Sequence, residues 1–153
     1  MALDATDSQI IALLRQDGRM SNSELASRIH RSESACHRRV RQLEKAGVIE
    51  GYAAVINQAA IGKPANIFVE ITLANMGEDT LNAFEEAVSA CDDVVTCFFM
   101  TGDADYLLHI AAANTEDYER IYRTHLSRLP GIARIRTSFA LRVVSRTEGG
   151  RRQ

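Results

Sequence analysis

The spacing of apolar residues in the first sixty positions follows the period of an α-helix. Three groups of apolar residues recur three or four positions apart, and these are Ile10, Leu13 and Leu14, then Leu25, Ala26 and Ile29, then Cys36, Val40 and Leu43. Such spacing gives each helix one apolar stripe that can face a shared core. The N-terminal part of the chain is therefore predicted to be a small bundle of three helices.

Capping residues indicate where these helices begin and end. The run from Thr6 to Gln9 and the run from Ser21 to Glu24 each have the form of a capping box at a helix start. Ser32 suits the N-cap of the third helix, and Gly47 suits the left-handed residue that ends it, which predicts a helix over residues 32–46. The second and third helices, separated by a brief connection, have the arrangement of a helix-turn-helix.

Residues 48–56 are rich in β-branched and aromatic types and predict a short strand, either a wing of the helix-turn-helix or the start of a linker. Residues 57–65 carry turn formers without a clear period, and we place the domain boundary there. The expected organisation is a DNA-binding domain over 1–56, a linker over 57–65, a second domain over 66–146 and a tail over 147–153.

In the second domain the helical period gives way to alternation. Ile67, Val69, Ile71 and Leu73 alternate with other residues and predict a strand over 66–73 with one buried face. A helix over 78–90, strands over 94–100 and 105–113, a helix capped by Thr115 and a strand over 135–143 follow. The order βαββαβ predicts a ferredoxin-like domain, with a four-stranded antiparallel sheet and both helices on one face. The fold class is α+β.

The predicted helix over 32–46 has a charged face opposite its apolar stripe. At about 100° per residue, Ser34, His37, Arg38 and Arg41 point away from the stripe, with Lys45 one turn further on. The window 28–45 holds six Arg and Lys residues against two Glu, a local charge of +4 in a chain whose net charge is −2. A solvated helix face is the alternative, but this asymmetry favours binding to double-stranded DNA.

Composition and motifs exclude several classes of protein. No apolar run approaches the roughly 18 residues of a membrane span and no signal-peptide pattern is present, so a cytoplasmic location without membrane contact is expected. Three cysteines without CxxC spacing predict buried thiols and neither a disulfide framework nor a zinc site, although a redox role for Cys91 or Cys97 stays open. No nucleophile and base cluster or phosphate-binding motif is found, so no catalytic residues and no cofactor are expected.

The predicted sheet leaves one face without a covering helix. Apolar residues such as Phe68 on this face would meet a second copy more readily than water, which predicts a homodimer. A dimer also suits a helix-turn-helix protein, since such proteins usually read two half-sites about one DNA turn apart.

Three stretches together resemble the Lrp/AsnC (leucine-responsive/asparagine regulator, or feast/famine) family of transcription factors. They are DGRMSNSELASRIHRSESACHRRVRQLEKAGVIEGY at 17–52, TGDADYLL at 101–108 and RLPGI at 128–132. The resemblance implies a DNA-binding head, a ferredoxin-like regulation domain, dimers that assemble into octamers, and amino acids or related small molecules as effectors. Many relatives carry Thr-Pro where this chain has Ser34-Ala35, so base preference cannot be borrowed.

The resemblance also implies an effector site between subunits, against the loop of residues 101–106. Its candidate residues are Thr101, Gly102, Asp103, Asp105 and Tyr106, with Ser138 on the last strand. A hairpin turn built on Gly102 is the structural alternative, and a divalent metal bound by the two Asp carboxylates is a further, weaker one. These readings leave effector identity and operator sequence open.

Two other functions stay open at this point. The chain could be an architectural protein that wraps DNA without responding to a ligand. Alternatively, the ferredoxin-like half could be an enzyme attached to a DNA tether, because that fold hosts many activities. The absence of a candidate nucleophile argues against an enzyme.

Overall fold

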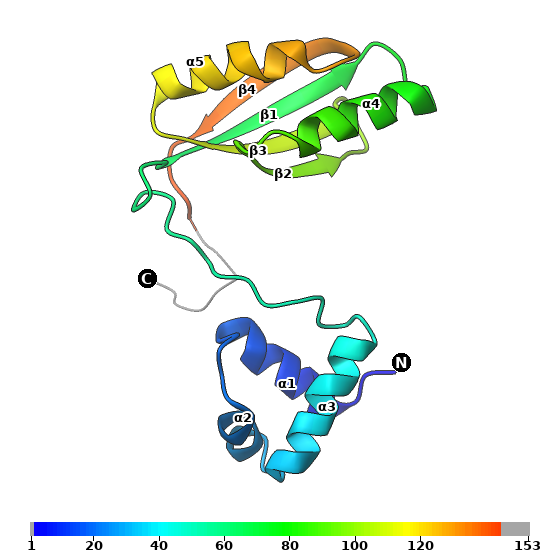
Figure 1. Cartoon of the computed structure of the whole chain (residues 1–153), viewed down its shortest axis with the longest axis vertical. Coiled ribbons are helices and arrows are strands. Elements are labelled where there is room, and N and C mark those ends of the chain that lie inside the picture. Colours follow the sequence, from blue (N-terminus) through cyan, green and yellow to red (C-terminus); the bar gives the residue numbers. More distant parts are fainter. Residues whose placement is uncertain (1, 145–153) are drawn as a thin grey trace. The chain divides into compact units, whose positions relative to one another are not determined.

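The computed structural model describes residues 2–144, which divide into two compact units, residues 2–56 and residues 57–143 (Figure 1). The first unit contains α1 (Ala5–Gln16), α2 (Asn22–Arg28) and α3 (Glu33–Lys45). Its core is formed by the apolar stripes that the sequence predicts, with Ile10, Met20, Leu25, Ala26, Ile29, Cys36, Val40 and Leu43 all buried. The predicted three-helix head is confirmed.

The capping residues of the head are close to those expected. The Ser32 hydroxyl accepts the Ala35 N–H at 3.3 Å, and Gly47 has a φ of 69°, as the end of α3 requires. Ser21 accepts the Glu24 N–H at 3.1 Å at the start of α2. The predicted start of α1 was wrong by two residues: Asp4 is the N-cap, and its capping box is reciprocated by Asp7, since a carboxylate accepts the same N–H bonds as a hydroxyl.

The strand predicted over residues 48–56 is absent, and these residues have no regular secondary structure beyond the turn that follows α3. A strand needs a partner for its backbone N–H and C=O groups, and no other strand occurs in the described part of this unit. Val48, Tyr52, Val55 and Ile56 are accordingly exposed.

The second unit is a four-stranded antiparallel sheet in the order β2-β3-β1-β4, with α4 (Glu78–Ser89) and α5 (Thr115–Thr124) on the same face (Figure 1). The strands are β1 (Ala65–Leu73), β2 (Val94–Phe99), β3 (Tyr106–Ala112) and β4 (Ile132–Ala140). Alternate residues of β1 fill the core under the helices, as the sequence predicts, and Ile67, Val69 and Ile71 have no exposed surface. The predicted ferredoxin-like domain is confirmed.

The boundaries of α5 and β4 differ from the prediction. Asn114, and not Thr115, is the N-cap of α5, because its side-chain oxygen accepts the Asp117 N–H at 2.9 Å. β4 begins at Ile132 and ends at Ala140, which pairs with Asn66 near the start of β1. Only Ala65 of β1 extends beyond this pair, and Leu141 and Val143 lie outside the strand. A one-turn 3-10 helix, η1 (Leu126–Arg128), joins α5 to the approach of β4.

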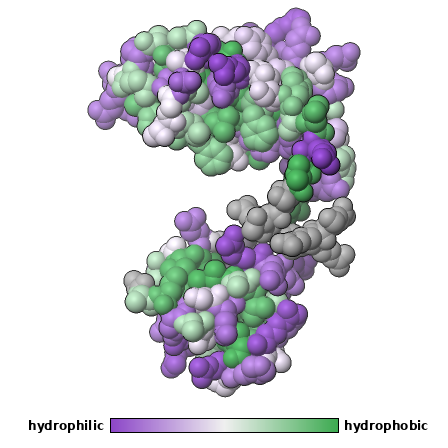
Figure 2. Space-filling model, turned by 180° about the vertical axis from the view of Figure 1, so that it is seen from behind, coloured by the Kyte–Doolittle hydropathy of each residue, from purple (hydrophilic) through white to green (hydrophobic). Residues whose placement is uncertain are grey.

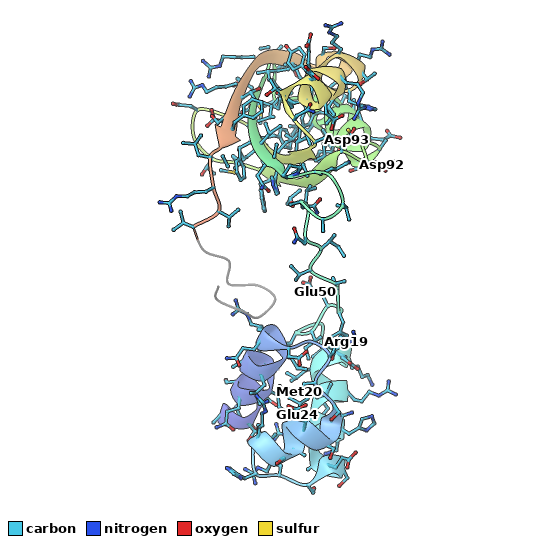
Figure 3. All side chains as sticks on the ribbon, turned by 90° about the vertical axis from the view of Figure 1, so that its left-hand side faces the viewer. Arg19, Met20, Glu24, Glu50, Asp92 and Asp93 are labelled. Carbon is cyan, nitrogen blue, oxygen red and sulfur yellow. The ribbon has the colours of Figure 1, made fainter. Side chains whose placement is uncertain are left out.

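Asp93 connects three segments of the second unit. It lies beside Asp92 between α4 and β2 (Figure 3) and accepts Lys63 Nζ at 3.0 Å and an Arg120 guanidinium nitrogen at 3.5 Å. These contacts join the segment before β1 and the outer side of α5 to the end of α4. The expected tail, residues 147–153, lies outside the described residues.

Candidate functional site

The polar side chains of α3 lie on the side opposite its buried stripe. Cys36, Val40 and Leu43 are buried, whereas the five residues expected to contact DNA are all exposed, namely Ser34, His37, Arg38, Arg41 and Lys45. Within residues 2–144, the side chains of His37, Arg38, Arg41 and Lys45 have no hydrogen-bond or ion-pair partner. Four donor groups on one helical face are thus available to an anionic partner.

Not every basic residue of this region belongs to that face. Arg39 is directed toward α1, where its guanidinium lies 2.8 Å from an Asp4 carboxylate oxygen and 3.2 Å from one of Asp7. Asp7 is 1% exposed, so Arg39 neutralises a buried carboxylate. Arg28 pairs with Glu24 within α2 at 2.8 Å. Fewer unpaired basic side chains are therefore available on the surface of this region than the sequence count suggests.

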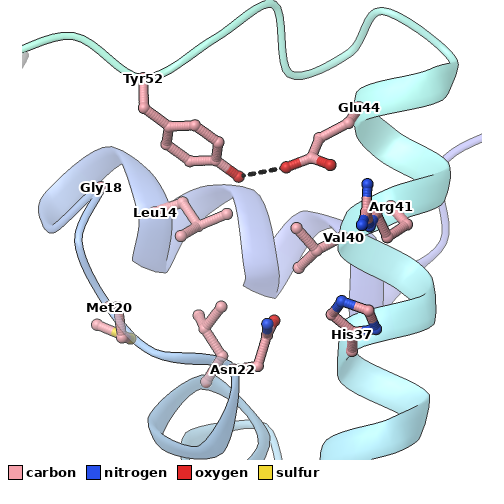
Figure 4. A pocket seen from close by; sticks show the side chains of 10 residues that line it. Leu14, Gly18, Met20, Asn22, His37, Val40, Arg41, Glu44 and Tyr52 are labelled. Carbon is pink, nitrogen blue, oxygen red and sulfur yellow. Dashed lines mark hydrogen bonds between the residues drawn. The ribbon is translucent and has the colours of Figure 1, made fainter.

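A hollow of about 320 Å³ lies beside the exposed face of α3 (Figure 4). Leu14, Met20, Leu25 and Val40 are among its apolar lining, and His37 and Arg41 are among its polar lining. The Tyr52 hydroxyl donates a hydrogen bond to the Glu44 carboxylate at 3.0 Å across this hollow (Figure 4). This hydrogen bond attaches Tyr52, which follows α3 in the sequence, to the last turn of that helix.

A second hollow of about 270 Å³ lies on the sheet face that no helix covers. It is lined by Thr101, Asp103 and Ala104 of the loop expected from the sequence, and by residues that sequence analysis missed, namely Glu70, Thr72, Met100, Leu107, Arg134 and Arg136. Arg136 pairs with Glu70 across the strands at 3.3 Å, and an Arg134 nitrogen lies 3.5 Å from the Thr72 hydroxyl. Strand alternation carried the signal for Glu70, Thr72 and Leu107, because each falls between core-facing positions of β1 or β3, whereas Met100 lies outside the strands.

The other expected effector residues do not line this hollow. The Asp105 carboxylate accepts the Leu73 N–H at 2.7 Å and so fixes the end of β1. Tyr106 is 1% exposed on the helix-covered side, where its hydroxyl donates to Glu85 at 2.7 Å and where burial raises the pKa of the phenol. Ser138 pairs with Phe68 on the uncovered face but does not line the hollow. Gly102 has a φ of 123°, which supplies the turn between β2 and β3.

Cysteine and metal chemistry have little support in the described residues. Cys36 and Cys91 are buried and Cys97 is half-buried, and burial raises the pKa of the Cys36 and Cys97 thiols, which disfavours reactive thiolates. Residues 2–144 contain no group of three or more His, Cys, Asp or Glu side chains placed to hold a metal ion. In the same range no helix is long and apolar enough to cross a membrane.

A helix-turn-helix head with an unpaired basic face, joined to a ferredoxin-like domain with a polar hollow, defines a class of two-domain DNA-binding transcriptional regulators. Comparison with known families agrees with this assignment. A model described as winged helix-turn-helix DNA-binding matches residues 3–50, and one described as Lrp/AsnC ligand binding domain matches residues 66–149. The chain belongs to the Lrp/AsnC family of transcriptional regulators.

Relatives of known identity cover almost the whole chain. The leucine-responsive regulatory protein of Haemophilus influenzae is 37% identical over 146 residues, which cover 95% of this chain and 88% of that protein. The Bkd operon transcriptional regulator of Pseudomonas aeruginosa is 36% identical over 142 residues, 93% of each chain. A Neisseria meningitidis transcriptional regulator solved as an L-Met complex superposes with a TM-score of 0.89 at 30% identity, over 95% of this chain and 94% of that one.

Proposed function

We propose that the exposed face of α3 reads base edges and phosphates in the major groove of DNA. The observation that carries this proposal is the set of exposed polar side chains opposite the buried stripe, Ser34, His37, Arg38, Arg41 and Lys45, of which all but Ser34 have no partner within residues 2–144. Arg38 and Arg41 have the fork of donors that fits a guanine edge, and Lys45 suits a phosphate. DNA binding would place the protein in the cytoplasm, with the chromosome.

The regulator is proposed to act as a homodimer that assembles further to an octamer, as its resemblance to the family implies. The uncovered sheet face supports this proposal, because Phe98 on β2 is 52% exposed and Phe68 on β1 is 38% exposed. Figure 2 shows green, hydrophobic residues along the lower side of this unit as drawn. Burying such a face against a second copy would remove apolar surface from water and would bring two heads to one DNA site.

The proposed effector is an amino acid bound at the hollow on the uncovered sheet face, at a contact between subunits. Glu70 and Asp103 supply carboxylates for an ammonium group, and Arg134 and Arg136 supply guanidinium donors for a carboxylate. Met100 and Leu107 offer apolar surface to a side chain. The L-Met complex of the Neisseria meningitidis relative supports an effector of this class.

Catalysis has no part in the proposed function. Histidine is the usual general base, and His109 on β3 instead stacks on the Phe68 ring at 5.0 Å, with its Nε2 2.9 Å from the Asn66 side-chain oxygen. Tyr106 and Asp105 likewise serve the fold.

The effector proposal is tested by fluorescence anisotropy of the full-length protein on a duplex selected from a random pool, with each of the twenty amino acids in turn. At least one should change the DNA affinity by about 5- to 150-fold, the usual size of an allosteric coupling. Arg134→Gln should abolish the response to the amino acid and leave ligand-free DNA binding intact. The control Arg123→Gln, on α5, should keep both the response and the ligand-free DNA binding.

Two results would contradict the effector proposal. If Arg134→Gln responds as the parent does, the effector site lies elsewhere. If no amino acid changes DNA affinity or assembly, the ligand-independent architectural role is favoured instead.

A further inference from the structure

Tyr52 connects the ends of two helices of the head. Its hydroxyl donates to Glu44 Oε1 at 3.0 Å, in the last turn of α3 (Figure 4). Its ring lies beside Gly18, two residues after the end of α1, because a Cβ built on Gly18 would be 3.7 Å from Tyr52 Cδ1. Since Tyr52 stands outside any regular element, these contacts determine where its hydroxyl lies.

Glu44 is the acidic neighbour of the proposed DNA-contacting face. It follows Arg41 by three positions, the spacing at which two side chains on a helix surface can form an ion pair. In the structure that pair is not formed: the Glu44 carboxylate is directed to Tyr52, and Arg41 has no partner within residues 2–144 (Figure 4). A released Glu44 would compete with DNA for the Arg41 guanidinium and would place a negative charge near the phosphates.

We infer that Tyr52 is a positioning residue for DNA recognition, which holds the Glu44 carboxylate away from Arg41 and so keeps Arg41 available to DNA. The inference rests on the proposed assignment of Arg41 to the DNA-binding face. The phenol stays protonated at neutral pH and can serve as the donor, because burial and the bond to Glu44 raise the pKa of Tyr52.

The test is a double-mutant cycle in the full-length protein with Tyr52→Phe, Glu44→Gln and both together, on the duplex selected by the parent. Tyr52→Phe keeps the ring beside Gly18 and removes only the donor. A helix-surface ion pair is weak, so binding should weaken by about 1.5- to 2-fold per head and about two- to fourfold when two heads engage. Glu44→Gln should restore it in the double variant, because the amide carries no charge to compete for Arg41.

The salt dependence gives a readout that a purely structural role for Tyr52 would not change. The slope of log K against log salt should become shallower in Tyr52→Phe, toward the slope of Arg41→Ala, and should return to the parent value in the double variant. Parent-like binding by Tyr52→Phe, or a double variant as weak as Tyr52→Phe, overturns the inference. Arg41→Ala separates the two proposals, since its parent-like binding would instead remove Arg41 from the DNA-binding face.

Discussion

Neighbouring arginines on α3 have different surroundings because their side chains leave the helix in different directions. Arg38 is exposed and unpaired, whereas Arg39 contacts Asp4 and the buried Asp7. Composition counts the two residues alike. The turn of about 100° between adjacent helix residues predicts that the two side chains point in different directions. The partners of Arg39 lie about thirty residues away in the sequence and could not be deduced from the local pattern.

Arg39→Ala should destabilise the head, because it leaves the Asp7 carboxylate buried without its cation. The expected loss is about 2–3 kcal/mol of unfolding free energy, less than for a fully buried pair because Arg39 is partly exposed. Urea unfolding followed by circular dichroism measures it. Arg38→Ala is the matched control and should unfold as the parent does; equal stability of the two variants would contradict the role given to Arg39.

The stability of the head should depend on pH through the ionisation of Asp4, which lies beside Arg39 and Asp7. The Asp7 N–H bond and the Arg39 guanidinium lower the pKa of Asp4 below its ordinary value. Because its pKa is lower in the folded state, the ionised Asp4 stabilises the protein at pH values above its unfolded-state pKa, about 3.9. This stabilisation is lost as the pH falls through the folded-state pKa.

Asp4→Asn keeps a residue that can cap α1 and removes the charge. The parent should therefore be more stable than Asp4→Asn in urea unfolding at pH 7, and the difference should vanish at the acid end of the series. A difference that is constant from pH 7 to pH 2 would show that the charge of Asp4 does not matter.

At the scale of elements, the start of β4 depends on a close approach at Gly131. This residue has a φ of 73°, and a Cβ on it would lie 2.6 Å from Thr80 Cγ2 in α4. Gly131→Ala should therefore lower the unfolding free energy by about 2–4 kcal/mol, through backbone strain and the clash together.

Gly62→Ala is the matched control for Gly131→Ala in thermal or urea unfolding. Gly62 also has a positive φ, of 79°, but a Cβ there would meet nothing within 4 Å. It should lose only the backbone contribution, about 1 kcal/mol. If both variants lose the same stability, the contact with Thr80 contributes nothing.

Elements with a strong period were predictable, and those that depend on distant partners were not. The alternation of β1 and the stripe of α3 each follow from residues within one element. Residues 48–56 have strand-forming composition but lack a neighbouring strand, and only the tertiary structure decides that. The cap of α5 shifted by one residue because Asn114 and Thr115 are both good capping residues.

At the scale of the molecule, the order of elements was enough to predict the sheet topology, but not the hollow that we propose as the effector site. Thr101 and Asp103 were found through the loop, whereas Glu70, Arg134 and Arg136 come from β1 and β4. Their meeting depends on strand register, which pairs Glu70 with Arg136. Asp105 and Tyr106 were expected beside them, but a carboxylate and a phenol at a strand start serve the fold equally well, through Leu73 and Glu85.

Association through the uncovered sheet face predicts that Phe98→Lys shifts the full-length protein toward monomer. A lysine there would carry a charge into the apolar contact. Sedimentation velocity over a concentration series measures the shift. Met76→Lys is the control, since Met76 is also exposed, at 48%, but lies in the connection before α4. An unchanged assembly in Phe98→Lys would place the interface elsewhere.

The central claim, that α3 binds DNA through its exposed polar face, is tested most directly by the affinity of full-length variants for a selected duplex across a salt series. Arg38→Ala or Arg41→Ala should weaken specific binding by about 1–3 kcal/mol where the side chain reaches a guanine edge. Lys45→Ala should weaken binding to all sequences and reduce the salt slope by roughly one. Arg15→Ala, an exposed arginine on α1, should bind as the parent does. Parent-like affinity and salt slope in all three α3 variants, with their folding intact, would contradict the account.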